Sequence, residues 1–365
     1  MKIVTTSYAK DETFNNPYAW LKRISFYTGI LEKLAADHEV ISIERINYEG
    51  WLQLNGVFYY FMRLKRNVVF FPWRMHRFIR KQRPDIVLVH GFIFPLQIIQ
   101  LRLSLGKRPK IIVQNHAEKP ASGVRSFFQR LADHVIDAYF FTSPEMAREW
   151  TERGIIRKEK KVVEIMEVSS VFSYSEKDRR KNLDNVKGLT FLWVGRLNAN
   201  KDPITVVKAF VNFLSHQPQA RLNMIYQEDV LLNDIKQLIG ANRQAAGAIV
   251  LAGQVPHRQL QEWYNAADFF ISGSHYESGG VAVCEAMSCG CIPVLTNIIS
   301  FQMMTNRGAC GLLYEAGNEK NLLNCLLQTQ KMDINKEREK VLEQFNKELS
   351  FEAIAQKIDK AITAL

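Results

Sequence analysis

The sequence predicts an α/β protein made of two doubly wound, Rossmann-like halves. The chain has 365 residues, which is more than one ordinary domain contains. Apolar runs alternate with amphipathic stretches along it, a pattern typical of parallel strands flanked by helices. Hydrophobic residues make up 47% of the chain, enough for two cores and too many for a disordered protein.

Short apolar runs in the first half predict the strands of one sheet. These runs are residues 2–7, 40–43, 86–90, 110–114, 138–142 and 162–166. A charge-dense stretch then predicts a linker, after which residues 189–194 begin a second sheet. We therefore expect an N-terminal domain over 1–172, a linker over 173–187 and a C-terminal domain over 188–340, with a helical segment over 341–365.

The most informative segment combines a strand, a glycine turn and a helix. An apolar strand leads to a polar turn with Glu277, then to Gly279-Gly280, and a helix of small apolar residues starts at Val281. Such a turn leaves backbone N–H groups open to a ligand, and the helix start adds partial positive charge. This arrangement suits a phosphate. Glu285 lies in the helix among apolar residues, where burying an unpaired acid costs free energy. The simpler interpretation is that Glu277 and Glu285 are both solvated acids on the surface.

The pair of acids separated by seven residues resembles the E-x7-E signature of retaining glycosyltransferases of family 4, which have the GT-B fold. Residues 275–294 carry this resemblance. Two more segments match in the right order, namely 191–197 followed by Lys201-Asp202-Pro203, and 251–257 followed by Leu260 and Tyr264. The resemblance implies two Rossmann-like domains that face each other across a cleft, an N-terminal domain on the acceptor side, a C-terminal domain that binds a nucleotide sugar, and a last helix that crosses back to the N-terminal domain.

The resemblance also implies roles for individual residues. Arg196 and Lys201 would hold the diphosphate of the donor and stabilise it as it leaves, although spacing alone also fits a carbonyl cap and a solvated lysine. Glu277 would contact the donor sugar and Glu285 the ribose. Fixed positive groups and backbone donors lower the barrier of a step in which negative charge grows. The backbone groups expected near the donor belong to Gly279, Gly280, Val281 and Val255.

No metal or other cofactor is expected, because the chain has no Asp-x-Asp pair and the nucleotide sugar is a substrate. His116 follows the strand 110–114 and resembles a histidine that many relatives place beside the donor sugar. It fits an ordinary hydrogen-bonding residue equally well, and His90 is a weaker candidate. The chain departs from the family in the loop after its first strand, which lacks glycine, and at 226–229, where relatives have a glycine turn.

Positive charge is concentrated in residues 51–130, which hold fifteen basic and two acidic residues of a chain with net charge +11. Residues 51–83 mix these cations with aromatic side chains, as segments at a membrane interface do. The alternative is a packed aromatic core beneath a solvated basic face. No nucleic-acid-binding motif accompanies the charge, so a nucleic acid is not expected as a partner. We expect an anionic membrane surface instead.

These observations predict a retaining glycosyltransferase that uses a nucleotide-sugar donor and a lipid-linked or cell-surface glycan acceptor. No signal peptide precedes the first strand, no apolar run reaches the ~18 residues of a spanning helix, and the five cysteines lack metal-site spacing. We therefore expect a cytoplasmic enzyme at the inner face of the membrane. The alternatives are a sugar-nucleotide epimerase with the GT-B fold and a catalytically silent domain that binds a glycan or a partner.

Overall fold

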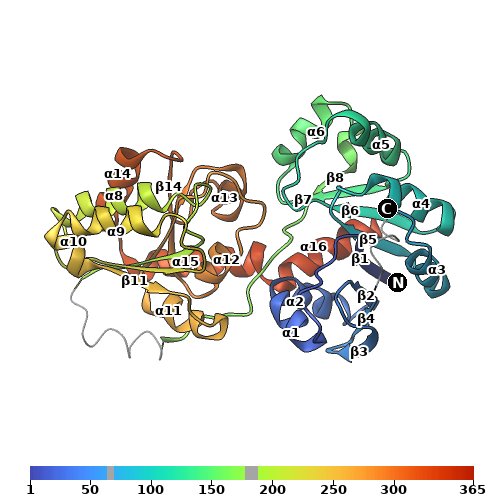
Figure 1. The fold of residues 1–365 in the computed structure, drawn as a ribbon, viewed down its shortest axis with the longest axis horizontal. Coiled ribbons are helices and arrows are strands. Elements are labelled where there is room, and N and C mark those ends of the chain that lie inside the picture. Colours follow the sequence, from blue (N-terminus) through green and yellow to red (C-terminus); the bar gives the residue numbers. More distant parts are fainter. Residues whose placement is uncertain (64–69, 177–187) are drawn as a thin grey trace. The chain divides into compact units, whose positions relative to one another are not determined.

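The computed structural model describes residues 1–63, 70–176 and 188–365, which form two compact α/β units (Figure 1). The N-terminal unit comprises Met1–Ser169 together with Phe351–Leu365, and the C-terminal unit comprises Ser170–Ser350. The chain thus changes unit after Ser169 and again after Ser350, whereas the sequence placed the boundaries after residues 172 and 340. Most of the expected linker, residues 177–187, lies outside the described residues.

An eight-stranded sheet forms the centre of the N-terminal unit, in the order β3-β4-β2-β1-β5-β6-β7-β8. All neighbouring strands are parallel except the hairpin β3–β4. The strands are β1 (Lys2–Ser7), β2 (Glu39–Glu44), β3 (Gly50–Leu54), β4 (Val57–Phe61), β5 (Ile86–His90), β6 (Lys110–Gln114), β7 (Ala138–Phe141) and β8 (Val162–Glu164). Each of the six apolar runs forms a strand, and the hairpin adds two strands that the sequence patterns did not predict.

The hairpin corrects part of the interpretation of residues 51–83 as an interface segment. Val57, Tyr59 and Phe61 alternate with half-buried residues along β4 and are fully buried. These side chains pack in the sheet because strand residues point alternately to its two faces. Trp51, by contrast, is 66% exposed on the edge strand β3. The aromatic residues of this segment therefore divide between the core and the surface.

Helices cover both faces of this sheet (Figure 1). α2 contacts α16, whereas α3 contacts α4 and α4 contacts α5. The ring of Phe351 would lie 2.6 Å from a Cβ at Gly29, so the absence of a side chain at Gly29 lets the returning helix α16 pack closely on α2. The helices are α1 (Pro17–Arg23), α2 (Ser25–Leu34), α3 (Trp73–Gln82), α4 (Pro95–Leu105), α5 (Gly123–Asp133), α6 (Arg148–Glu152) and α16 (Phe351–Thr363).

The C-terminal unit is built on a six-stranded parallel sheet in the order β11-β10-β9-β12-β13-β14. Its strands are β9 (Thr190–Gly195), β10 (Arg221–Tyr226), β11 (Ile249–Gly253), β12 (Phe269–Ser272), β13 (Ile292–Thr296) and β14 (Leu312–Tyr314). Its α-helices are α8 (Pro203–Leu214), α9 (Leu232–Gly240), α10 (Arg243–Ala248), α11 (Leu260–Ala266), α12 (Val281–Ser288), α13 (Ile299–Met304), α14 (Glu319–Thr329) and α15 (Ile334–Gln344).

Aromatic packing fixes the centre of this second sheet. The rings of Phe191 on β9 and Phe269 on β12 stack with their centroids 5.0 Å apart, and Phe210 and Phe213 of α8 meet Phe191 edge-on. Because β9 and β12 are adjacent and parallel, the loops at their carboxyl ends lie side by side, where ligands of such sheets bind. In the described part of the chain, no helix is long and apolar enough to cross a membrane.

Candidate functional site

Two loops meet at the carboxyl ends of β9 and β12. Asn200 after β9 accepts a hydrogen bond from the backbone N–H of His275 (2.8 Å), and its side chain donates to the carbonyl oxygen of Tyr276 (3.1 Å). Gly273 makes this approach possible, because a Cβ there would lie 2.8 Å from the carbonyl oxygen of Asp202 and 3.0 Å from that of Lys201. The loop with Lys201 is therefore held against the loop that precedes the glycine pair.

Lys201 and Glu277 form an ion pair across these loops. The Glu277 carboxylate also accepts a hydrogen bond from the Ser274 hydroxyl at 2.9 Å. The two side chains are 27% and 17% exposed, so both charges are partly shielded from water yet remain within reach of a ligand. Two residues that the sequence singled out separately thus lie in direct contact, and the Lys201 ammonium is already neutralised by Glu277.

The helix α12 begins at Val281, four residues after Glu277. Gly280 has φ +55°, a left-handed conformation, and a Cβ at this position would lie 2.9 Å from the ring of Phe301. Both facts favour glycine here. The first intrahelical bonds run from the amides of Val283 and Cys284 to the Gly280 carbonyl oxygen. The amides that precede them in the first turn carry the positive end of the helix dipole, which attracts anions.

Glu285 is buried one turn into α12, with 5% of its surface exposed. Its carboxylate contacts the His257 imidazole (Nε2 to Oε1, 2.6 Å) and accepts a hydrogen bond from the Tyr264 hydroxyl (3.0 Å). Burial and the nearby Glu285 charge raise the pKa of Tyr264, so it remains a donor. The ring of Phe172 lies against His257, with 4.9 Å between centroids. His257 and Tyr264 therefore explain how the Glu285 carboxylate is tolerated among apolar residues. The sequence had not indicated which residues would pair with it.

Arg196 and Val255 occupy the surface near these groups. The Arg196 side chain is 62% exposed, and its guanidinium lies 3.7 Å from the carboxylate of Glu228. Glu228 follows β10, at the point where the family resemblance implied a glycine turn, and its carboxylate supplies a counter-charge for Arg196. Val255 is half-buried in the loop after β11, two residues before His257. Arg196 therefore pairs with Glu228, while Lys201 pairs with Glu277.

The described residues contain no cluster of three or more His, Cys, Asp or Glu side chains arranged to hold a metal ion. All five cysteines are buried and free. Burial raises the pKa of Cys289 and of Cys310 to about 12, so neither thiol is a ready nucleophile near neutral pH.

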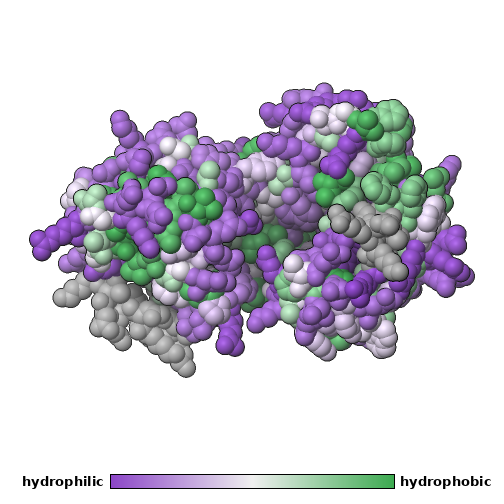
Figure 2. Space-filling view, in the orientation of Figure 1, coloured by the Kyte–Doolittle hydropathy of each residue, from purple (hydrophilic) through white to green (hydrophobic). Residues whose placement is uncertain are grey.

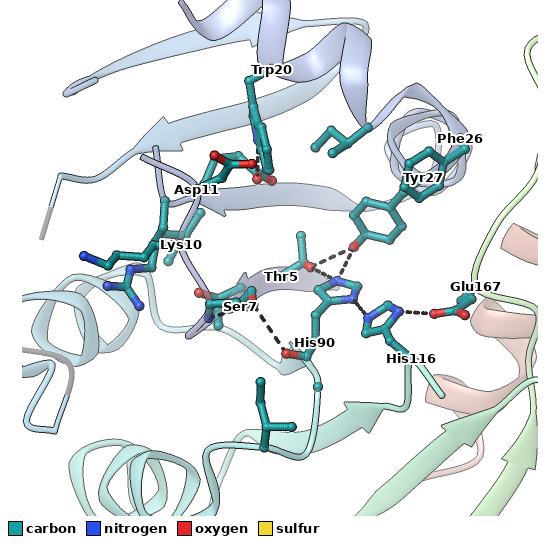
Figure 3. A pocket seen from close by; sticks show the side chains of 18 of the residues that line it. Thr5, Ser7, Lys10, Asp11, Trp20, Phe26, Tyr27, His90, His116 and Glu167 are labelled. Atoms are coloured by element: carbon teal, nitrogen blue, oxygen red, sulfur yellow. Dashed lines mark hydrogen bonds and ion pairs between the residues drawn. The ribbon is translucent and has the colours of Figure 1, made fainter. Parts of the chain in front are cut away.

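The N-terminal unit contains a cavity of about 430 Å³ at the carboxyl ends of its central strands (Figure 3). Its wall is largely apolar and aromatic, with Trp20, Phe26 and Tyr27 on one side. Trp20 is oriented by a 2.7 Å hydrogen bond from its indole N–H to the Glu44 carboxylate. Acidic, basic and hydroxyl side chains also line the cavity, as do His90 and His116. It can therefore hold a polar ligand against aromatic surfaces.

Two histidines continue a chain of hydrogen bonds along this cavity. The His90 Nε2 atom lies 2.6 Å from the Tyr27 hydroxyl and 2.8 Å from the Thr5 hydroxyl, and its Nδ1 lies 2.9 Å from His116 Nε2. The Nδ1 atom of His116 pairs with the buried carboxylate of Glu167. Figure 3 shows the two rings in line between Tyr27 and Glu167. A proton bound at one end of this chain fixes the direction of every bond along it.

The environment moves the pKa values of the two histidines in opposite directions. Burial lowers the pKa of His90 well below 6.5, and a positive charge on His116 lowers it further. Burial also opposes a charge on His116, but the Glu167 carboxylate outweighs it and raises the pKa of His116 above 6.5. His116 is thus the member of the pair that becomes positively charged first as the pH falls. Sequence reasoning identified His116 but missed Glu167 and Tyr27, because neither belongs to a motif.

Two family models match this chain. The family model described as "Glycosyltransferase Family 4" matches residues 31–164, and the model described as "Glycosyl transferases group 1" matches residues 175–348. A GDP-mannose:cellobiosyl-diphosphopolyprenol alpha-mannosyltransferase of Xanthomonas oryzae is 32% identical over 127 residues, 34% of this chain and 33% of that protein. A D-inositol 3-phosphate glycosyltransferase of Thermobispora bispora is 24% identical, over 65% of this chain and 55% of that protein. The matches thus span about a third to a half of these relatives' own length.

Solved structures show the same fold over the whole chain. A glycosyltransferase from Rickettsia africae superposes with a TM-score of 0.75 at 16% identity, covering 100% of this chain and 98% of that one. Anabaena HepE, solved in complex with UDP, superposes with a TM-score of 0.73 at 13% identity and covers 100% of both chains. The two sheets match the expected GT-B architecture, and the two family models together match most of the sequence. The chain therefore belongs to the group 1, family 4 glycosyl transferases with the GT-B fold.

Proposed function

We propose that this protein is a retaining, metal-independent glycosyltransferase that takes a sugar from a nucleotide-sugar donor. One observation carries the proposal: Lys201 forms an ion pair with Glu277, in the loop that leads directly into α12, and Glu285 is buried one turn into that helix. A cation and helix-start amides suit a diphosphate, and carboxylates suit the hydroxyls of a sugar and a ribose. The names of related proteins support this choice, since one relative uses GDP-mannose and HepE was solved with UDP-glucose.

In this proposal Lys201 exchanges one partner for another during donor binding. The donor diphosphate replaces Glu277 beside the ammonium, and the Glu277 carboxylate then accepts a hydrogen bond from a sugar hydroxyl. As the bond between the anomeric carbon and the diphosphate oxygen breaks, negative charge grows on the diphosphate. Lys201, Arg196 and the first amides of α12 stabilise that charge, so the reaction needs no metal. The proposed product keeps the anomeric configuration of the donor.

We propose that the acceptor binds in the cavity of the N-terminal unit. The aromatic residues Trp20, Phe26 and Tyr27 suit the apolar faces of a sugar, and His116 suits one of its hydroxyls. The acceptor class proposed is a lipid-linked or cell-surface glycan; one relative is named for a cellobiosyl-diphosphopolyprenol acceptor. Such an acceptor would place the enzyme at the cytoplasmic face of the cell membrane, in accord with the basic composition of residues 51–130.

Thermal stabilisation by ligands tests the donor site. Nucleoside diphosphates and nucleotide sugars would be added to the wild type, Lys201→Ala and Glu285→Ala, with Lys208→Ala as a control on the exposed side of α8. A ligand at about a hundred times its Kd adds about 2.7 kcal/mol to the free energy of unfolding. We expect one nucleotide and its sugar to stabilise the wild type and the control, but not Lys201→Ala. If no nucleotide stabilises the wild type, the proposal fails, and a silent binding domain becomes the better explanation.

A further inference from the structure

The helix α5 in the N-terminal unit turns its polar face inward and its apolar face outward, the opposite of an ordinary surface helix. Its inward residues are polar: Ser126, Gln129 and Asp133 are 8%, 1% and 1% exposed. Its outward residues are apolar: Val124, Phe127 and Leu131 are 74%, 56% and 40% exposed. Positions 124, 127 and 131 lie on one face because they are spaced by about one and two helical turns. A helix on a water-facing surface normally shows the opposite pattern.

Hydrogen bonds hold the polar side of α5 inward. The Gln129 amide donates to the carbonyl oxygen of Phe92 (3.0 Å) and accepts from the backbone N–H of Ala121 (3.1 Å). Asp133 accepts from the Tyr139 hydroxyl (3.1 Å) and pairs with Lys161 (3.2 Å). Rotating the helix would break these buried bonds, so the orientation is fixed by the fold and the apolar stripe must face outward.

The neighbouring helices of the same layer add to this apolar surface. Leu103 of α4 is 78% exposed, and at the start of α3 Phe70, Phe71 and Trp73 are 66%, 53% and 59% exposed. α3 packs on α4 and α4 packs on α5, so these helices form one layer. Figure 2 shows hydrophobic residues gathered on the part of the N-terminal unit that carries α4 and α5. We call the exposed apolar residues of α3, α4, α5 and the segment before α3 the docking face.

Positive charge predominates among the residues of α3, α4 and α5 and of the segments that join them. Exposed cations lie on α3, between α4 and β6, and on both flanks of the apolar stripe of α5; they are Arg77, Arg80, Lys81, Lys107, Arg108, Arg125 and Arg130. Residues 70–135 contain three acids, and each is engaged within the fold. Asp133 is buried, Asp85 accepts from the Lys2 backbone N–H at 2.8 Å, and Glu118 accepts from the backbone N–H of His116 at 2.7 Å.

We infer that the docking face binds an anionic lipid bilayer directly, with the apolar stripe of α5 inserted at the interface and the flanking cations against lipid headgroups. The combination of exposed apolar side chains and surrounding cations matches what interfacial helices use. A nucleic acid would explain the cations but would leave the Val124–Phe127–Leu131 stripe in water. The inference extends the proposed location of the enzyme to particular residues, and it stands independently of the transfer reaction.

Vesicle co-sedimentation of the full chain tests this inference. Vesicles of phosphatidylcholine alone are compared with vesicles that also contain phosphatidylglycerol. We expect the wild type to prefer the anionic vesicles by at least about tenfold, with the preference reduced by added salt. The double variant Phe127→Ser, Leu131→Ser should bind about tenfold more weakly for each side chain withdrawn from lipid. Val230→Ser, at a 74% exposed valine of the C-terminal unit, is the matched control.

A charge-reversal pair completes the experiment. Arg77→Glu with Arg80→Glu should abolish the preference for anionic vesicles, whereas Lys208→Glu in the C-terminal unit should retain it. Three results would overturn the inference. The wild type could bind both vesicle types equally, the Phe127→Ser, Leu131→Ser variant could bind as well as the wild type, or the protein could bind single-stranded RNA in place of vesicles. The inference would also be overturned if sedimentation velocity showed a dimer of the wild type that the Phe127→Ser, Leu131→Ser variant does not form. Nucleotide-induced stabilisation, measured in parallel, reports on the donor site and separates a failure here from a failure of the proposed function.

Discussion

The Lys201–Glu277 ion pair makes opposite predictions for its two members. In the unliganded protein the Glu277 carboxylate competes with a diphosphate for the Lys201 ammonium. Lys201→Met removes a charge-assisted contact to the diphosphate, which is worth about 1.5–3 kcal/mol. Both the nucleoside diphosphate and the nucleotide sugar should then bind about 10- to 150-fold more weakly.

Glu277→Gln should act differently on the two ligands. Glutamine keeps an acceptor for the Ser274 hydroxyl but frees the ammonium. Because the pair is partly exposed, the gain is at most about 1 kcal/mol, or about fivefold tighter binding of the nucleoside diphosphate. The nucleotide sugar loses its charged acceptor and should bind about tenfold more weakly relative to the diphosphate. The affinities of the two ligands therefore separate the two roles proposed for the Glu277 carboxylate, namely pairing with Lys201 and accepting a hydrogen bond from the sugar.

Isothermal titration calorimetry with the nucleotide pair identified by thermal stabilisation gives both affinities for each variant. Lys208→Met, on the exposed side of α8, is the control for Lys201→Met. Lys201→Met removes the cation beside Glu277 and leaves the Ser274 hydroxyl as a donor to its carboxylate, so a loss of about 1–3 kcal/mol in the free energy of unfolding is also expected and is measured without ligand. Wild-type diphosphate affinity in Lys201→Met, or parallel losses of both ligands in Glu277→Gln, would refute the reasoning.

Three further predictions concern other parts of the two units. Glu228→Gln should tighten nucleoside diphosphate binding by up to about fivefold, because it releases Arg196; unchanged titration curves would contradict this. Gly280→Ala should lower the melting temperature by an amount equivalent to about 1–2 kcal/mol, since φ is +55° and the new Cβ would crowd Phe301. Glu167→Gln should destabilise the protein most below pH 6.5. The Glu167 carboxylate raises the pKa of His116, and the stability that this pairing gives is present below pH 6.5 and is lost as the pH rises through the raised pKa. A difference in melting temperature that does not depend on pH would refute this prediction.

The strands and the donor-site motifs could be predicted because they are local in sequence. Most predicted strands are runs of apolar residues buried on both faces of a parallel sheet, and such runs can be recognised without knowing their neighbours; β8 is a less buried edge strand. The hairpin β3–β4 was missed because its aromatic residues, mixed with cations, also fit an interface segment. Tyr59 proved to be buried and Trp51 exposed, a difference that depends on which side of the strand each residue occupies.

The partners of the site residues could not be predicted for the same reason. Lys201 meets Glu277 because the loops after the adjacent strands β9 and β12 converge. Glu285 meets His257 and Tyr264 because α12 packs beside α11 and the segment that precedes it. Both His257 and Tyr264 lie in the second matching motif, so a signal was present, but its meaning depends on the fold. The polar side of α5 gave no local signal that it faces inward, since its partners come from other elements.

We propose that this protein breaks the bond between a sugar and a nucleoside diphosphate with retention of anomeric configuration. The most direct measurement is proton NMR of the sugar released slowly to water from the nucleotide sugar that stabilises the protein, recorded before the free sugar equilibrates. We expect release of the nucleoside diphosphate together with a first-formed sugar that has the anomeric configuration of the donor, and we expect Lys201→Met to release neither. The proposal would be contradicted if the opposite anomer were released, if the product were an unsaturated sugar formed by elimination, or if a bound donor released no product.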